Sequence, residues 1–354
     1  MKLVIFGLTV SSSWGNGHAT IWRGLCSALA RQGHEIKFFE RDVSYYAQHR
    51  DLSTGDSYEI VFYRDWNEIT ATAQSALNTA DCAVVTSYCP DARAAADLIL
   101  NSPVPLRIFY DLDTPVTLDR LRAGEDVEYV PSYGLEPFDL VLSYTGGPAL
   151  QELQRRLGAR RVAPLYGSAD PAVHQPTAPK PRYESQLSYL GTYASDRQGK
   201  LQDLFIEPAR RCPGKRFVLG GAQYPSEFPW TSNIWFVRHV PPPEHPAFYC
   251  SSDLTLSVTR AAMAEMGYCP SGRLFEAAAC GTPVVSDHWD GLEEFFEPGR
   301  EILVVSNADE VEEALSLSHE QLRRIGEAAR RRVLTDHTAD RRGSELLSLL
   351  EVAA

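Results

Sequence analysis

The chain has 354 residues, more than a single ordinary hydrophobic core holds, so we expect two domains of similar size. Its composition, 44% hydrophobic and 23% charged, is typical of a soluble globular enzyme or binding protein, and no apolar run is long enough to span a bilayer. A net charge of −12 argues against a general nucleic-acid binding protein, which needs a basic surface.

The seven cysteines are scattered along the chain, and none of them forms a C-x-x-C pair. This distribution argues against a disulfide framework and against a zinc site. It indicates reduced thiols, and we therefore expect a cytoplasmic protein.

The first forty residues predict a strand, a helix and a second strand. The apolar run 2–6 is typical of a buried parallel strand, and we interpret it as this and not as a signal peptide. A helical pattern then runs to Gly33, and 35–39 predicts the next strand. Open α/β sheets bind ligands in the loops that follow their strands, so we expect the loop after 2–6 to line a site.

That loop contains Gly15, Gly17 and His18. Its glycines are close to the dinucleotide fingerprint, and Glu40 lies about twenty residues further on, where a ribose-binding acid would stand, but Thr20 replaces the third glycine. A histidine at the mouth of the first helix can accept a proton from a hydroxyl near neutral pH. The alternative for His18 is a capping or packing role.

A further strand, 105–111, ends in the sequence Asp111-Leu-Asp113. The spacing is similar to the D-x-D motif that holds a divalent metal in other proteins. Two carboxylates are too few to hold a metal, and the sequence places no third acid beside them, so we expect no metal site. Asp113 is also a candidate cap for a helix that begins near Pro115.

Helix and strand periodicity disappears after residue 170. The segment 171–182 is rich in proline and alanine and is typical of a linker. We therefore expect an amino-terminal domain over 1–170, a carboxyl-terminal domain over 183–335, and a final helical segment over 336–354.

Two arginines precede or begin the helix that follows the strand 253–260. Arg260 ends this strand and Arg273 lies in the first turn of the helix. Together with the open N–H groups near Gly272, these guanidinium groups can hold a diphosphate and stabilise its charge. The alternative is an ion pair with a nearby acid: Glu265, Glu276 or Asp287.

The same helix contains Glu276 among small residues. A buried carboxylate needs a partner, and two neighbouring hydroxyls of a ribose can supply one, although an ion pair with Arg273 is the alternative. Asp287 and Trp289 follow the next strand and are expected to line a sugar pocket, because a tryptophan face packs against a hexose.

The segment RLFEAAACGTPVV, residues 273–285, resembles the donor-binding motif E-A-x-A-x-G-x-P-V of GT-B glycosyltransferases. With the following SDHWDGLEEFFEPGREILVV it is most similar to the CgeB-like, spore-maturation branch. The resemblance implies an α/β fold with two Rossmann-like domains that face each other across a cleft. It further implies transfer of a hexose from a nucleotide diphosphate sugar, with UDP favoured, to an acceptor hydroxyl, without metal or cofactor, and a last helix that crosses back to the first domain.

The resemblance also assigns donor-side roles. Glu276 would hold the ribose, a glycine turn the phosphates, and the residues after the strand 233–240 the base. Tyr268 stands where many retaining relatives have a second glutamate, which leaves retention or inversion of the anomeric centre open. The remaining donor-side candidates are Gly191, Thr192, His239 and Val240.

On the acceptor side, the resemblance to inverting members implies that His18 is the general base, with Asp113 as an acceptor-side residue or a rival base. Gly15, Gly17 and Asp111 are expected beside the acceptor, which is a small molecule, a glycan, a lipid or a protein. Arginines and a helix dipole would replace the metal used by other folds.

Three other functions remain open. A nucleotide-sugar 2-epimerase or hydrolase shares the fold and needs no acceptor, an NAD-dependent oxidoreductase would use the first glycine loop, and a non-catalytic protein would only bind the sugar nucleotide. The arginine-rich stretch 321–333 is interpreted as the solvated face of an amphipathic helix, or as a contact with an acidic membrane surface.

Overall fold

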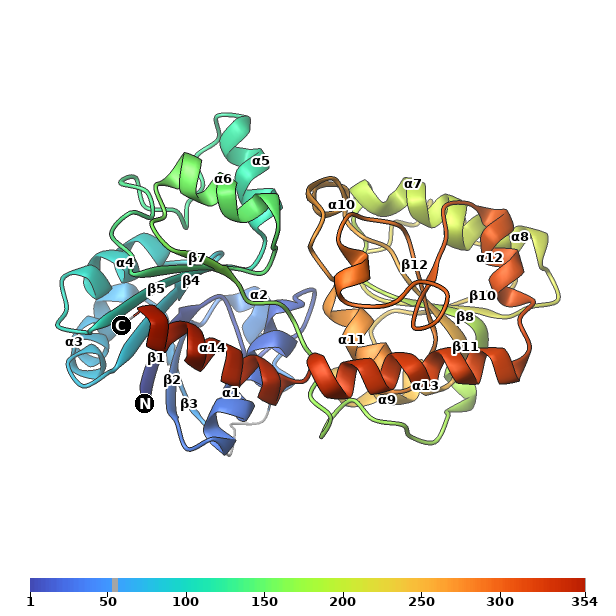
Figure 1. Cartoon of the computed structure of the whole chain (residues 1–354), viewed down its shortest axis with the longest axis horizontal. Coiled ribbons are helices and arrows are strands. Elements are labelled where there is room, and N and C mark those ends of the chain that lie inside the picture. Colours follow the sequence, from blue (N-terminus) through green and yellow to red (C-terminus); the bar gives the residue numbers. More distant parts are fainter. Residues whose placement is uncertain (53–56, 354) are drawn as a thin grey trace. The chain divides into compact units, whose positions relative to one another are not determined.

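The computed structural model describes residues 1–52 and 57–353, which divide into two compact units (Figure 1). The first unit contains Met1–Tyr166 and Ala339–Ala354, and the second contains Gly167–Thr338. The chain thus enters the second unit a few residues before the expected linker. The segment 171–182 packs within the second unit, where the Lys180 backbone N–H donates to Ser251 Oγ at 2.8 Å.

The first unit is built on a seven-stranded parallel sheet with the order β3-β2-β1-β4-β5-β6-β7. Its strands are β1 (Lys2–Gly7), β2 (Glu35–Arg41), β3 (Glu59–Tyr63), β4 (Cys82–Thr86), β5 (Leu106–Asp111), β6 (Leu140–Ser143) and β7 (Val162–Pro164). Its helices are α1 (His18–Arg31), α2 (Ser44–Ala47), α3 (Trp66–Leu77), α4 (Ala92–Leu100), α5 (Thr114–Arg122), α6 (Pro148–Leu157) and α14 (Ala339–Ala353).

The second unit repeats this plan with a six-stranded parallel sheet in the order β10-β9-β8-β11-β12-β13. Its strands are β8 (Ser185–Leu190), β9 (Phe217–Gly220), β10 (Ile234–Val237), β11 (Ser252–Ser257), β12 (Val284–Ser286) and β13 (Leu303–Val304). Its α-helices are α7 (Gln198–Leu201), α8 (Glu207–Arg211), α9 (His245–Cys250), α10 (Ala261–Met266), α11 (Gly272–Ala279), α12 (Ala308–Leu315) and α13 (His319–Asp336). Short 3₁₀ helices are η1 (Pro181–Tyr183), η2 (Ser195–Arg197), η4 (Pro242–Glu244) and η5 (Leu292–Glu294), and the π-helix η3 (Gln202–Ile206) joins α7 to α8.

Both sheets follow from nearly continuous apolar strands, which become buried when helices cover both faces. β4 and β9 are buried along their whole length. The strand order reverses between β1 and β4 in the first unit and between β8 and β11 in the second. Ligands of such sheets bind at these reversals, beyond the carboxyl ends of the strands. We therefore expect the loops after β1, β8 and β11 to line the binding sites.

The last helix belongs to the first unit, although it follows the whole second unit in sequence (Figure 1). α14 packs against α1, where an Arg31–Asp340 ion pair of 2.9 Å joins them. Gly24 of α1 lies opposite Ala339, and these small residues allow the two helices to approach closely.

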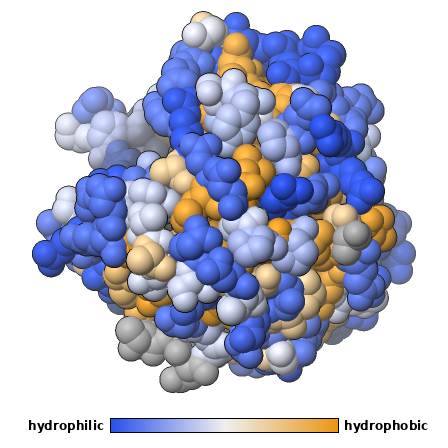
Figure 2. Space-filling view, turned by 90° about the vertical axis from the view of Figure 1, so that its left-hand side faces the viewer, coloured by the Kyte–Doolittle hydropathy of each residue, from blue (hydrophilic) through white to orange (hydrophobic). Residues whose placement is uncertain are grey.

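Hydrophilic residues predominate on the face of the molecule drawn in Figure 2, and hydrophobic residues form smaller areas among them. None of the helices within 1–52 and 57–353 is long and apolar enough to cross a membrane. The arginine-rich stretch lies in α13, where acids neutralise part of its charge: Arg323 pairs with Glu320 and Glu327, and Arg332 with Glu301 and Asp336. These pairs favour the solvated-face interpretation.

Candidate functional site

The loop after β8 brings its backbone close to neighbouring loops of the second unit. Gly191 N–H donates to Gly220 O at 2.8 Å, and the Tyr224 hydroxyl donates to Gly191 O at 3.0 Å. A Cβ on Gly191 would lie 2.8 Å from the Tyr189 hydroxyl, so only glycine fits without a shift. Thr192 follows at the surface of this turn, half-buried.

Arg197 lies beside this turn, on η2, and is buried with 7% of its surface exposed. Its Nη2 donates to Thr192 O at 2.8 Å, whereas its Nε has no hydrogen-bond partner within the described part of the chain. Burial lowers the pKa of Arg197, and the nearby positive charge of Arg273 lowers this pKa further. Arg197 is not among the site residues that the sequence predicts, because nothing in the local sequence marks it as buried.

Arg273 lies in the first turn of α11, half-buried. Neither Arg273 nor Arg197 forms an ion pair with any acid in 1–52 or 57–353, so the expected alternative for Arg273, a pair with Glu276, is not formed. The charge of Arg273 is near enough to lower the pKa of Arg197, and two such guanidinium groups without an ion pair can hold an anion. The amino-terminal N–H groups of α11 at Gly272 add to the positive potential.

Arg260 pairs with Asp196, with 3.1 Å between Nε and Oδ2, and not with any of the three expected acids. Asp287 is buried and holds the loops after β8, β11 and β12 together. Its Oδ1 accepts from the Thr259 N–H at 2.9 Å and from the Thr259 hydroxyl at 3.0 Å, and its Oδ2 pairs with Lys200. These contacts give Asp287 a defined orientation.

Trp289 has 2% of its surface exposed and packs against Phe295, with ring centroids 5.9 Å apart. Its ring faces the core, which does not fit the expected stacking against a hexose. Tyr268 has a φ of +49°, and its ring covers Gly291, where a Cβ would come within 2.5 Å of it. Gly272, four residues after Tyr268, begins α11 and thus lies at the positive end of its helix dipole.

Glu276 lies on α11 and is buried, with a hydrogen bond of 3.3 Å from the Tyr249 hydroxyl to its Oε2. Two imidazoles face the same carboxylate: His174 Nε2 is 4.0 Å from Oε1, and His245 Nδ1 is 3.8 Å from Oε2. Burial raises the pKa of Glu276, but the two histidines and Arg273 outweigh it and lower this pKa to about 2. Glu276 is therefore an ionised acceptor of hydrogen bonds.

Neither histidine is among the site residues that the sequence predicts. His245 Nε2 contacts Val240 O at 3.1 Å, at the corner where the expected base-side residues His239 and Val240 follow β10. His174 lies in the segment that the composition marks as a linker, and no sequence pattern distinguishes it. The nitrogen and oxygen atoms of His174, His245 and Glu276 lie within 4.8 Å of one another, and this group has the ligand types of a zinc site.

In the first unit, the loops after β1 and β5 bring His18 and Asp113 together. His18 begins α1, and its backbone N–H donates to Asn16 Oδ1 at 3.0 Å. Its Nε2 lies 3.3 Å from Asp113 Oδ2, and the two side chains are 13% and 18% exposed. Asp113 stands at the N-cap of α5, but its side chain makes no capping hydrogen bond. The carboxylate is therefore available to the imidazole.

Asp111, two residues before, is fully buried at the end of β5. Its Oδ1 accepts from the Asp113 N–H at 3.1 Å, and its Oδ2 has no partner within the described residues. Burial raises the pKa of Asp111 to about 6. Asp111 thus supports the Asp113 loop from below, and its burial does not fit direct contact with an acceptor.

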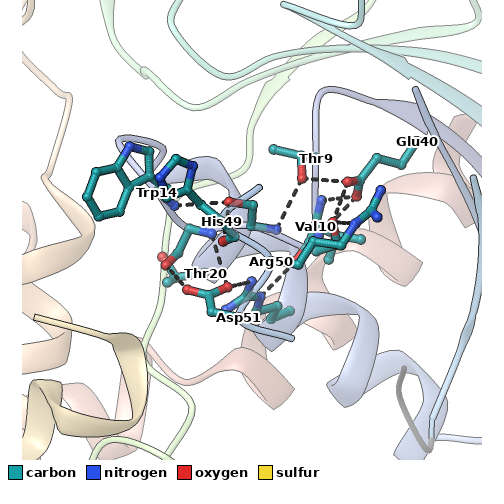
Figure 3. A network of polar contacts seen from close by, with 12 residues as sticks. Thr9, Val10, Trp14, Thr20, Glu40, His49, Arg50 and Asp51 are labelled. Carbon is teal, nitrogen blue, oxygen red and sulfur yellow. Dashed lines mark hydrogen bonds and ion pairs between the residues drawn. The ribbon is translucent and has the colours of Figure 1, made fainter. Parts of the chain in front are cut away.

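The glycine loop that carries Gly15, Gly17 and His18 is held by two acids (Figure 3). The Glu40 carboxylate accepts four hydrogen bonds, all from residues 9–11: from the Thr9 hydroxyl and Val10 N–H at 2.7 Å, and from the Ser11 N–H and hydroxyl at 2.9 and 2.5 Å. Asp51 accepts from Ser13 and from Arg23 in the same way. Glu40 thus binds its own loop, and the dinucleotide interpretation loses its ribose-binding acid.

Residues 197–348 match the family described as glycosyl transferase-like. The whole chain is similar in structure to sucrose-phosphate synthase of Thermosynechococcus elongatus, with a TM-score of 0.69, 15% identity and 100% of both chains covered. It is also similar to HepE of Anabaena in complex with UDP and glucose, with a TM-score of 0.68 and 14% identity over 99% of this chain and 100% of that one.

An α-glucosyltransferase in complex with UDP and DNA gives a TM-score of 0.74 at 15% identity, with 99% of each chain covered. Comparison with curated protein sequences finds no match. At such identities the structural likeness establishes the fold, which is GT-B. It confirms the predicted α/β class with two Rossmann-like domains.

Proposed function

We propose that the protein transfers a hexose from a nucleotide diphosphate sugar to an acceptor hydroxyl and needs no metal ion. The observation that carries this proposal is that Arg197 and Arg273 form no ion pair with the described residues, while Arg197 donates to Thr192 O in the turn where β8 ends and the charge of Arg273 acts on it. A diphosphate is the anion that a GT-B donor domain has to hold at this reversal of strand order. The family match over 197–348 supports the same activity.

The second unit would hold the donor. Arg197, Arg273 and the amino terminus of α11 at Gly272 neutralise the diphosphate, and Glu276 accepts hydrogen bonds from the ribose. His239 and Val240 lie on the base side, with Thr192 near the phosphates. UDP is favoured because solved structures similar to this chain include complexes with UDP and with UDP-glucose.

The first unit would hold and activate the acceptor. His18 Nε2 takes the proton of the acceptor hydroxyl as its oxygen forms a bond to the anomeric carbon, and the bond from that carbon to the diphosphate breaks. Asp113 stabilises the imidazolium so formed, and the two arginines take up the charge of the departing diphosphate. Gly15 and Gly17 shape the acceptor side of the loop after β1, and Asp111 supports the loop that carries Asp113. Direct displacement with inversion agrees with Tyr268 in place of a second glutamate.

A thermal-shift titration with UDP, GDP, TDP, their sugar conjugates and NAD, each with and without magnesium, tests the donor assignment. We expect one nucleoside diphosphate to stabilise the protein without metal, and Arg197→Met to remove this shift; a ligand at a hundred times its Kd adds about 2.7 kcal/mol. Stabilisation by NAD alone would overturn the proposal.

The reaction itself is tested by following the sugar nucleotide with and without added acceptors. Acceptor-dependent release of the nucleoside diphosphate is expected. Turnover without any acceptor would instead indicate the epimerase or hydrolase, and binding without turnover would indicate a sensor. Within this activity we place the protein in the CgeB-like branch and in the cytoplasm, and a net charge of −12 disfavours a nucleic-acid acceptor.

A further inference from the structure

We propose that His174 and His245 bind the two ribose hydroxyls of the donor together with Glu276, and that each histidine makes the pocket selective for one of these hydroxyls. This inference rests on the proposed function, because it names the groups that recognise the donor's ribose. The three residues come from separate segments: His174 from the segment before η1, His245 from the start of α9, and Glu276 from α11.

Glu276 is a buried carboxylate with few hydrogen-bond donors around it. Its side chain is 8% exposed, yet its one hydrogen bond from the described residues is that of Tyr249, at 3.3 Å. A buried, ionised carboxylate normally accepts several hydrogen bonds, because each lone pair left without a donor is costly. Glu276 is thus arranged to accept hydrogen bonds from a ligand.

Each oxygen of the Glu276 carboxylate is separated from one imidazole by more than a hydrogen-bond length. Separations of 4.0 Å and 3.8 Å are too long for direct hydrogen bonds. A hydroxyl oxygen that bridges the two groups would lie about 2.7 Å from the carboxylate oxygen and about 2.9 Å from the imidazole nitrogen. If the angle between these two hydrogen bonds at the hydroxyl oxygen is roughly 90°, the carboxylate oxygen and the imidazole nitrogen are about 4 Å apart. Each gap therefore fits one hydroxyl.

One gap lies between His174 and Oε1 of Glu276, and the other lies between His245 and Oε2 of the same carboxylate. They consequently fit two hydroxyls on neighbouring carbons, which is the arrangement of the ribose 2′ and 3′ positions. A single hydroxyl or a lone amine would fill one gap and leave the other imidazole without a partner.

The protonated nitrogen of each histidine decides whether it donates to a hydroxyl or accepts from it. His245 Nε2 contacts the Val240 carbonyl at 3.1 Å, which places the proton on Nε2 and leaves Nδ1 as an acceptor toward the ligand. His174 Nδ1 is buried without a partner in the described residues, so a neutral His174 carries its proton on Nε2, facing Glu276. One hydroxyl can thus donate to Glu276 Oε1 while it accepts from His174 Nε2, and the other can donate its single proton either to Glu276 Oε2 or to His245 Nδ1.

The experiment measures the affinity of UDP, 2′-deoxy-UDP and 3′-deoxy-UDP by isothermal titration calorimetry in EDTA. The variants are His174→Leu and His245→Leu, with His174→Gln and His245→Asn as conservative replacements. His319→Leu, at an exposed position on α13, is the control. Circular dichroism checks that each variant folds, and if a leucine variant does not fold, the conservative one carries the test.

We expect the unmodified protein to prefer UDP over each deoxy ligand by about tenfold to a hundredfold, because a lost hydroxyl leaves buried polar groups unpaired. Each leucine variant should weaken UDP about tenfold but leave one of the two deoxy ligands unaffected, so that each histidine couples to one hydroxyl. The conservative variants should recover part of the UDP affinity.

Three results would overturn the inference. The histidine variants could weaken UDP and both deoxy ligands equally, or the unmodified protein could bind all three ligands alike. Stoichiometric Zn²⁺ binding that both leucine variants abolish, together with UDP binding that EDTA removes, would instead make the cluster a metal site. If the unmodified protein binds no nucleoside diphosphate with or without EDTA, the proposed function itself fails, and the two failures are thereby distinguished.

Discussion

His18 Nε2 lies 3.3 Å from Asp113 Oδ2, although ninety-five positions of sequence separate the two residues. His18 follows the loop after β1 and Asp113 follows β5, and the parallel sheet brings the carboxyl ends of both strands to one edge. The sequence presents these residues as rival candidates for one role. The structure makes them partners, in which a carboxylate orients and stabilises a histidine.

The first prediction concerns this pair. His18→Ala should lower kcat by about 10²–10⁴, which is the typical contribution of a general base, and should leave the Kd of the donor nucleotide unchanged. Asp113→Asn should also lower kcat, and the double variant should lose less than the sum of the two effects, because the residues act as one unit. Steady-state kinetics with the preferred donor measure all three variants.

His34→Ala is the matched control, since His34 lies at the opposite end of the sheet, where its Nδ1 contacts the Met1 amino group at 3.0 Å. Independent, additive losses in the double variant would show that His18 and Asp113 do not act together.

The sequence predicts those parts of the site that one short segment contains. Glu276, Arg273 and Gly272 lie within a single turn or two of α11, so their spacing alone places them on one helix end. Arg197 could not be selected, because its surroundings include Tyr189, Tyr224 and Arg273, which come together only in the fold. His174 could not be predicted for the same reason. The proline-rich composition of 171–182 indicates a linker, and it does not show that His174 is buried beside Glu276.

Two interpretations failed because local patterns do not show what a side chain contacts. Glu40 stands at the spacing of a ribose-binding acid, yet all its acceptor capacity goes to residues 9–11. Trp289 follows a strand where a sugar-stacking residue is expected, but an apolar neighbour, Phe295, packs against its ring. Both outcomes depend on long-range packing.

The second prediction concerns Arg197. Arg197→Met should weaken UDP binding about tenfold to a hundredfold, because a charged hydrogen bond to phosphate contributes about 1.5–3 kcal/mol. The melting temperature of the ligand-free protein should stay the same or rise, since a buried guanidinium without an acidic partner is costly. Calorimetric titration and thermal melts measure the two effects, and Arg210→Met, exposed on α8, serves as the control. A variant that loses stability but keeps its affinity for UDP would show that Arg197 is structural.

The third prediction concerns pH and Asp111. The pKa of Asp111 is about 6 in the folded chain and 3.8 for an ordinary aspartate, so the folded state binds the proton more tightly. Protonation of Asp111 therefore stabilises the folded state by about 3 kcal/mol relative to the ionised form. This stabilisation is complete below pH 3.8 and is lost as the pH rises through 6. Asp111→Asn should therefore stabilise the protein relative to the unmodified chain at pH 7.5, and this gain should shrink toward pH 4.5.

Thermal melts across this pH range measure the difference between the two proteins. Asp203→Asn, at an exposed site on η3, should show no such trend. A gain from Asp111→Asn that does not change with pH would mean that burial does not raise the pKa of Asp111.

The fourth prediction concerns Glu40, whose carboxylate receives four hydrogen bonds from the loop that leads to His18. A glutamine there offers one acceptor oxygen and turns an NH₂ group toward donors, so Glu40→Gln should destabilise the first unit by about 3 kcal/mol. Because the proposed donor site lies in the second unit, the variant should lose transfer activity while its affinity for UDP stays the same. Urea unfolding, kinetics and calorimetry measure these three quantities, with the exposed Glu35→Gln as control. NAD binding by the unmodified protein that Glu40→Gln abolishes would instead restore the dinucleotide interpretation, since it would require Glu40 to release its loop and accept a ribose.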